Sequence, residues 1–156
     1  MRKMITRVLI LAPLALLLAA AACGSESPQG ELNREAVSGT KVDVDGGSYT
    51  NVVPEELQSM LDVKDFPLVN VHIPYEGEIE GTDSFIPFDR IDQYVDELPS
   101  NPDSKIVVYC RSGGMSAVAA ESLVSLGYTN VWNLDGGMIG WEATGYPLVY
   151  TDSATR

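Results

Sequence analysis

The stretch that most constrains the fold is an apolar strand-like run that passes through a glycine-rich loop into a helical pattern. Residues 105–109 (Lys-Ile-Val-Val-Tyr) form a continuous, mostly β-branched run, which is typical of a parallel strand covered on both faces of a sheet. Residues 115–126 repeat apolar side chains at helical spacing, and Gly127 follows where a left-handed cap belongs. A strand, a tight loop and a helix in this order predict an α/β fold.

The rest of the chain repeats this alternation of strands and helices. Residues 73–87, rich in proline, glycine and acids, are interpreted as a long loop. We predict one α/β domain over residues 46–150, with a mainly parallel central sheet flanked by helices on both faces, followed by a tail at 151–156. The other strands are expected at residues 49–52, 67–72 and 131–134, and the other helices from Pro54 onward, at 91–98 and at 138–143.

Composition and charge exclude several classes of function. The 156 residues include 22 acidic and 10 basic side chains, a formal charge of −12. A nucleic-acid partner is not expected, because phosphate binding needs a clustered basic surface. Two cysteines cannot form a disulfide framework, and with one histidine they leave little for a metal site. We therefore predict neither a metal nor a cofactor.

The first 22 residues have the features of an export signal. Three bases and no acids precede an apolar run that extends from Val8 to Ala22 and itself contains no charged residue. The run is short for a membrane-spanning helix and suits a signal peptide over residues 1–22. The small residues directly before Cys23 resemble a bacterial lipoprotein signal, which implies a lipidated Cys23 that anchors an exported protein to a membrane. A plain signal peptide cleaved beside Ala22 is the alternative.

The segment after the signal is poor in large apolar side chains. Residues 23–45 are interpreted as a flexible tether, unless the alternation of Val42 and Val44 begins an edge strand. Without residues 1–22, seven bases remain against 22 acids, a formal charge of −15. A small anion would therefore have to be bound by local groups against the overall charge.

The loop between the clearest strand and the clearest helix carries the candidate chemistry. Open α/β sheets bind ligands beyond the carboxyl ends of their strands. An amide-lined loop at a helix N-terminus stabilises a thiolate and an anionic substrate. We therefore predict a nucleophilic cysteine with a substrate-binding loop; a buried structural cysteine beside a tight turn is the alternative. The catalytic candidate is Cys110, and the substrate-binding candidates are Arg111, Ser112, Gly113, Gly114, Met115 and Ser116.

This loop resembles the active-site loop of the rhodanese-like sulfurtransferases. The resemblance implies that Cys110 takes the outer sulfur of a small anionic donor such as thiosulfate as a persulfide and passes it to a thiol or cyanide. It is supported by downstream residues similar to the family's C-terminal pattern: Leu126-Gly127-Tyr128, Val131, Leu134-Asp135-Gly136-Gly137, Trp141 and Gly145-Tyr146-Pro147.

Two other functions are weighed against sulfur transfer. Residues 70–72 read Asn-Val-His where the family commonly has Asp-Val-Arg, and Met115 stands where it often has arginine. Both departures favour a non-catalytic binding module. A cysteine-dependent phosphatase or arsenate reductase would resemble Cys-x5-Arg, with a bidentate arginine clamp, but the sixth residue after Cys110 is Ser116. We predict an extracytoplasmic single-cysteine sulfurtransferase.

Further polar residues are candidates for supporting roles. His72 either lies near Cys110 as a pH-sensitive partner or, as we favour, orders the following loop through hydrogen bonds. Asp135 is expected to cap the last helix, with direct catalysis a minor alternative. The acids of residues 76–83 are interpreted as a solvated acidic loop rather than a calcium site, able to repel anions or recognise a partner.

Overall fold

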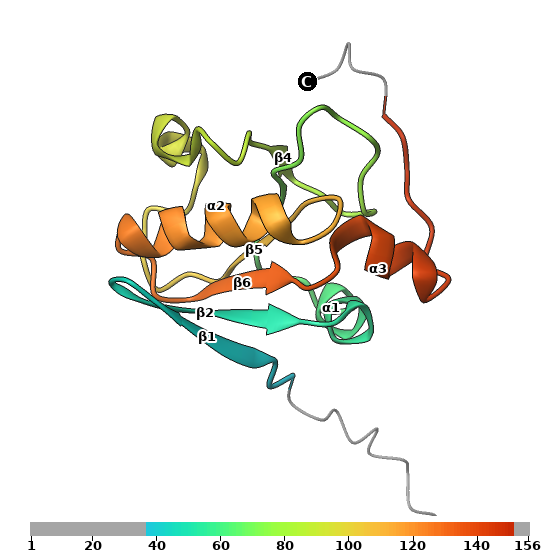
Figure 1. Ribbon diagram of the computed structural model, residues 1–156, viewed down its shortest axis with the longest axis horizontal. Helices are drawn as coiled ribbons and strands as arrows, with labels where there is room; N and C mark the ends of the chain where they lie inside the picture. The colour runs from blue at the N-terminus through green and yellow to red at the C-terminus, as the bar shows by residue number, and fades with distance from the viewer. Residues whose placement is uncertain (1–36, 152–156) are drawn as a thin grey trace, which may run out of the picture. The chain divides into compact units, whose positions relative to one another are not determined.

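A six-stranded sheet organises residues 37–151, the part of the chain that the computed structural model describes (Figure 1). Its strands lie in the order β1-β2-β6-β5-β3-β4. Only β1 and β2 pair antiparallel, and the four other pairs in the described sheet are parallel. The predicted α/β fold with a mainly parallel sheet is confirmed. The strands are β1 Thr40–Val44, β2 Gly47–Val52, β3 Leu68–Asn70, β4 Ser84–Phe85, β5 Ile106–Tyr109 and β6 Val131–Leu134.

Helices connect the strands and cover both faces of the sheet. Pro54 begins the first helix, where its missing N–H costs no hydrogen bond, and the Glu56 carboxylate accepts the Val53 amide at 3.0 Å. The helix with the longest apolar pattern in the sequence is also the longest of the described part. The α-helices are α1 Pro54–Leu61, α2 Gly114–Ser125 and α3 Gly137–Ala143, and two short 3-10 helices are η1 Ile91–Gln93 and η2 Val95–Glu97.

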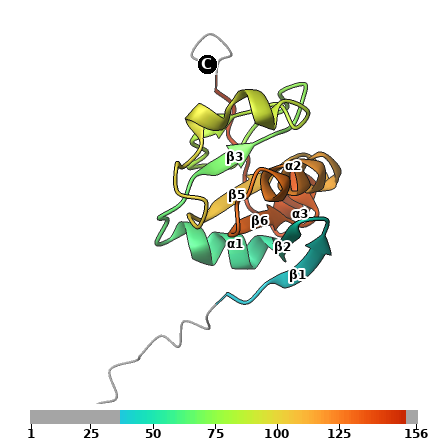
Figure 2. The same ribbon diagram turned by 90° about the vertical axis from the view of Figure 1, so that its left-hand side faces the viewer.

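The side chains of β5 divide between two hydrophobic clusters, one on each face of the sheet. Ile106 and Val108 pack in the cluster that α2 contributes to, whereas Val107 and Tyr109 pack with residues of α1 and α3. Successive strand side chains point to opposite faces, and all four are fully buried. Figure 2 shows α1 and α2 on opposite sides of the sheet. The continuous apolar run is therefore explained by burial on both faces.

The predicted start of the domain is wrong. Strand β1 occupies residues that we expected to belong to the tether, so the fold begins before Gly46. Val42 pairs with Tyr49 across a hairpin, and Gly46 in the turn adopts φ +88°, which glycine tolerates without steric cost. The structure contains the edge strand that we considered as the alternative for Val42 and Val44, namely β1.

The predicted long loop is partly wrong as well. Residues 84–85 form β4 beside β3, and Glu78 forms an isolated antiparallel bridge with Val149. The amide of Thr151, the first residue of the predicted tail, donates to the Tyr75 hydroxyl at 3.0 Å. The loop is thus held by β3 on one side and by the C-terminal segment on the other.

The helix predicted over residues 91–98 is replaced by the two 3-10 turns η1 and η2. Tyr94 between them has φ −117° and ψ 19°, outside the helical region, so the apolar spacing does not extend into one α-helix. No helix within residues 37–151 is long and apolar enough to cross a membrane. The predicted signal peptide and Cys23 lie outside the described residues.

Candidate active site

The loop after β5 turns back over Cys110 before it enters α2. Cys110 follows the last residue of β5 and is 1% exposed. Gly113, the residue directly before α2, adopts φ +94°, a left-handed conformation that favours glycine. A Cβ atom at Gly113 would also lie 3.3 Å from the Gly136 nitrogen. The sequence therefore places glycine where the chain must reverse and where a second turn approaches closely.

Two hydrogen-bond donors reach the sulfur of Cys110. The Gly113 amide donates to Sγ at 3.1 Å, and the Ser116 hydroxyl lies 3.4 Å from the same atom. Ser116 is fully buried in the first turn of α2, where its hydroxyl can also donate to the Gly113 carbonyl at 3.1 Å. Hydrogen bonds to an ionised acceptor are stronger than neutral ones. This arrangement can hold negative charge on Sγ in the thiolate form of Cys110.

The start of α3 supports the loop from its other side. The amides of Met138 and Ile139 donate to the carbonyl oxygens of Cys110 and Arg111, both at 2.9 Å. Gly137 has φ +56°, and a Cβ atom there would overlap the Cys110 carbonyl oxygen. Only glycine allows this close approach of two backbones. The pair Gly136-Gly137 therefore allows the start of α3 to pack directly against the backbone of the Cys110 loop.

Asp135 does not cap α3 as predicted. The residue in the capping position is Gly136, which has no side chain to offer. The Asp135 carboxylate instead accepts the adjacent Gly136 amide at 3.0 Å, and the Asp135 amide donates to the Val52 carbonyl at 2.9 Å. A Cβ atom at Gly113 would lie 4.0 Å from the Asp135 Oδ1. Asp135 thus lies beside the Cys110 loop and shapes the turn that supports it.

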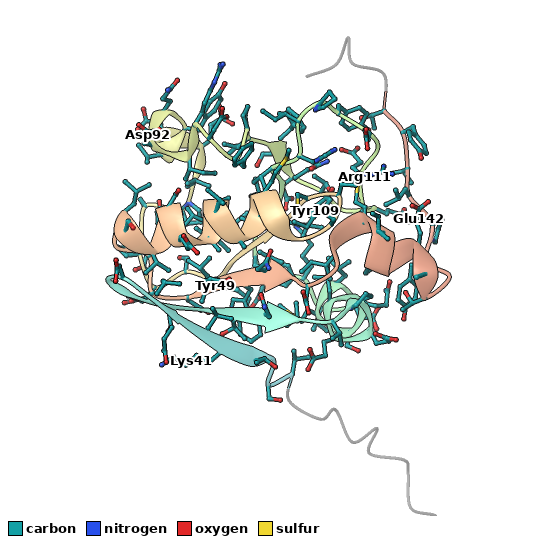
Figure 3. All side chains as sticks on the ribbon, viewed as in Figure 1. Lys41, Tyr49, Asp92, Tyr109, Arg111 and Glu142 are labelled. Atoms are coloured by element: carbon teal, nitrogen blue, oxygen red, sulfur yellow. The ribbon has the colours of Figure 1, made fainter. Side chains whose placement is uncertain are left out.

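Arg111, the cation expected to bind substrate, is paired with a carboxylate. Its Nη1 lies 2.5 Å from Oε2 of Glu76. Figure 3 shows Arg111 beside the loop that follows β3. The two side chains are 53% and 40% exposed, so the pair lies at the surface of the site. Glu76 is exposed, as expected for an acid of a solvated loop, but its carboxylate is also paired with Arg111.

His72 lies behind this pair. Its side chain is 8% exposed, and its Nε2 is 3.4 Å from the same Glu76 oxygen. That contact lacks hydrogen-bond alignment, and neither ring nitrogen has a hydrogen-bond partner in the described part of the chain. Of the hydrogen bonds expected to let His72 order the following loop, the described residues supply one, donated by its backbone amide to Asn70, and none to its ring. The adjacent Val71 amide donates to the Tyr109 carbonyl at 2.9 Å, so β3 and β5 bring His72 beside the segment that begins at Cys110.

The loop is ordered instead by Asn70, which the sequence did not mark as functional. Its Nδ2 donates to the Gly77 carbonyl at 3.0 Å, and its Oδ1 accepts the His72 amide at 3.0 Å. Asn70 is fully buried at the end of β3. A buried amide with both ends bonded is stabilising because neither end is left unsatisfied. The signal available in the sequence was a polar residue, Asn70, at the end of an otherwise apolar strand.

Two other acids of residues 76–83, Glu78 and Asp83, differ from the predicted solvated loop. Glu78 is buried, with Oε1 accepting the Thr151 hydroxyl at 3.2 Å. Asp83 accepts the Leu68 amide at 2.7 Å and pairs with Lys64 at 2.6 Å. Glu80 is exposed. Within residues 37–151, no group of three or more His, Cys, Asp or Glu side chains is placed to hold a metal ion.

Met115 and the remaining loop residues complete the site. Met115 is partly buried against the hydrophobic cluster on the α2 face of the sheet, while Ser112 and Gly114 are exposed. The structure thus defines an α/β protein with a cysteine at the carboxyl end of a central parallel strand, inside a loop of hydrogen-bond donors at a helix start. That is the arrangement of enzymes that use a cysteine as a nucleophile.

The chain belongs to the rhodanese-like domain family, whose model matches residues 53–144. It is 37% identical over 95 residues to a sulfurtransferase of Allochromatium vinosum, covering 59% of this chain and 86% of that protein. It is 32% identical over 111 residues to an uncharacterized protein of Synechocystis, covering 69% of this chain and 61% of that protein, less than two thirds of its length.

A solved structure shares the fold. The crystal structure of a rhodanese-related protein from Thermoplasma volcanium matches with a TM-score of 0.54 and 29% identity, covering 64% of this chain and 96% of that chain. The predicted rhodanese-like fold is confirmed, and the sulfurtransferase relatives support a sulfurtransferase-type function.

Proposed function

We propose that this chain is a single-cysteine sulfurtransferase that carries sulfur as a persulfide on Cys110. The observation that carries the proposal is the pair of donors on the sulfur, the Gly113 amide at 3.1 Å and the Ser116 hydroxyl at 3.4 Å. Preorganised donors favour a charge that is present during the reaction without further rearrangement of the protein. The two groups stabilise the Cys110 thiolate that attacks the donor and is released again when the sulfur is passed on.

Sulfur transfer takes two displacement steps. The Cys110 thiolate attacks the outer sulfur of a donor such as thiosulfate, the sulfur–sulfur bond of the donor breaks, and sulfite leaves with the electron pair. A thiolate or cyanide then attacks the outer sulfur of the persulfide and releases the Cys110 thiolate. The proposed partners are therefore a small anionic sulfur donor and a thiol or cyanide acceptor. Neither step requires an external oxidant or reductant.

Intact-mass measurement after incubation with a sulfur donor tests this proposal. We expect one added sulfur atom on the purified protein, removed by a thiol or by cyanide. Cys110→Ser should acquire none, because serine cannot form a persulfide. If neither thiosulfate nor polysulfide adds sulfur to the folded wild-type protein, the sulfurtransferase proposal fails.

A non-catalytic binding module is the second candidate. It is favoured by the engagement of Arg111 with Glu76 and by the packing of Met115 against the core. Both leave less free positive charge for a substrate. A phosphatase is not proposed, because the position of its arginine clamp is taken by Ser116, which is buried against the Cys110 sulfur.

We propose that the protein is exported and anchored to a bacterial membrane through a lipidated Cys23. The support is the basic start, the apolar run and the small residues before Cys23. Metabolic labelling with a fatty acid should mark the wild-type protein and should be lost in Cys23→Ser. Label that persists in Cys23→Ser would contradict the anchor.

A further inference from the structure

We propose that Glu76 selects the sulfur donor: it withholds the Arg111 guanidinium from dianionic donors and so favours donors with a single negative charge. The inference rests on the proposed sulfurtransferase function and concerns the substrate class of the same site. Monoanionic sulfane-sulfur donors include organic thiosulfonates and persulfides of small uncharged thiols. Thiosulfate, a dianion, is then a poor donor for this protein.

The distance between the two side chains is the first support. Arg111 Nη1 and Glu76 Oε2 are 2.5 Å apart, so a carboxylate already accepts from the guanidinium that stands next to Cys110. A donor anion must compete with that carboxylate for the N–H groups of Nη1. The formal charge of the pair is zero, so Arg111 adds little attraction for an incoming anion while Glu76 is in place.

The position of Glu76 is fixed by its neighbours, which is the second support. The carbonyl of Gly77 accepts the buried Asn70 amide at 3.0 Å, and Glu78 is bonded through its backbone to Val149 at 2.9 and 2.8 Å. On the other side, the buried His72 ring lies 3.4 Å from the Glu76 carboxylate. The segment that carries Glu76 is therefore anchored directly beyond it, and the carboxylate is in place before a donor arrives.

Two other bases of the described part are engaged elsewhere. Lys64 pairs with Asp83 at 2.6 Å. Lys105 lies over the Phe66 and Trp132 rings and precedes β5, at the opposite end of that strand from Cys110. The chain as a whole carries a formal charge of −12. Repulsion by Glu76 is therefore not offset by these bases, and it grows in proportion to the charge of the donor.

A pair of donors that differ by one charge isolates this effect. Thiosulfate and an arenethiosulfonate both give up a sulfur attached to an oxidised sulfur atom, releasing sulfite and a sulfinate respectively. The value of kcat/KM for each donor reports the donor step. In Glu76→Gln we expect the ratio of kcat/KM for thiosulfate to kcat/KM for the thiosulfonate to rise roughly five- to tenfold.

Glu80→Gln is the matched control. It removes one negative charge from the same loop, but Glu80 is exposed and forms no ion pair or hydrogen bond with the described residues. Its donor ratio should stay within about twofold of the wild-type ratio, because Glu80 has no ion pair with Arg111 to release and its charge is screened by salt. An equal rise in both variants would show an effect of overall charge and would overturn the proposal.

A double-mutant cycle tests the role of Arg111. In an Arg111→Met background, Glu76→Gln should raise the donor ratio by clearly less than it does in the wild-type background, because only the direct repulsion is relieved and no guanidinium remains to be released. An undiminished rise in that background, or no rise in Glu76→Gln alone, overturns the inference. Glu76→Asp, which withdraws the carboxylate by one methylene, provides a second variant if Glu76→Gln does not fold. Failure of the proposed function is distinguished by the absence of a Cys110 persulfide with either donor in the wild-type protein.

Discussion

Gly137→Ala is expected to destabilise the domain by roughly 3 kcal/mol or more and to prevent persulfide formation on Cys110. Two costs add at this position. The backbone has φ +56°, and an added Cβ would overlap the Cys110 carbonyl oxygen and lie 2.8 Å from that of Arg111. Because both atoms belong to backbone, no side-chain rotation relieves the overlap. The start of α3 must move, and the hydrogen bonds that hold the Cys110 loop move with it.

Gly145→Ala separates the two costs. Gly145 has φ +91°, but a Cβ there would meet nothing within 4 Å. This variant should lose only about 1–2 kcal/mol, the cost of a left-handed conformation for an L-residue, and should still form the persulfide. Urea unfolding measures both free energies, and intact mass measures the persulfide. Equal destabilisation by the two substitutions would show that the contact with the Cys110 loop has no energetic consequence.

Tyr109→Phe is expected to lower the free energy of unfolding at neutral pH by about 1–3 kcal/mol. Tyr109 is the last residue of β5 and is fully buried. Its hydroxyl accepts the Ile79 amide at 3.0 Å and lies 2.6 Å from the Thr82 hydroxyl. Phenylalanine fills the same space but leaves the buried Ile79 amide without a partner. Tyr146→Phe is the control, since the described residues offer the Tyr146 hydroxyl no hydrogen bond.

The same hydroxyl should make the wild-type protein sensitive to alkaline pH. Burial raises the pKa of Tyr109 to about 12, from 10.0, despite hydrogen bonds from Thr82 and Ile79 that act in the other direction. Between these values the unfolded chain loses the proton while the folded protein keeps it. Stability is therefore fully present below pH 10 and falls as pH rises toward 12, by about 2–3 kcal/mol in total.

Comparison with Tyr109→Phe isolates this contribution. The variant keeps the raised pKa of Tyr49, which is due first to burial and then to Glu121 and Asp135. It lacks the titrating hydroxyl at position 109. The difference in unfolding free energy between wild type and variant should shrink from pH 8 to pH 12. A difference that is independent of pH would show that Tyr109 does not keep its proton in the folded protein.

The elements that were predicted from the sequence are those stabilised by their own local pattern. Strand β5 and helix α2 agree with the structure within about a residue, because burial on both faces and helical spacing are visible in contiguous residues. Strand β4 was not assigned, and β1 was considered only as the alternative to a tether. The two residues of β4 form a strand only because β3 lies beside them, and a partner strand is not part of the local pattern.

The features of the site also divide into those predicted from the local sequence and those that depend on the tertiary structure. The sequence by itself determined that Cys110 follows a parallel strand, that glycine lets the loop reverse, and that a helix begins just after the glycines, because these properties belong to neighbouring residues. Only the tertiary structure decided that Arg111 would face Glu76, 35 residues away, and that Gly137 would meet the Cys110 carbonyl. The physical reason is the sheet order. Because β5 lies between β3 and β6, the segments that follow all three strands meet at one edge, and contacts between distant residues arise only there.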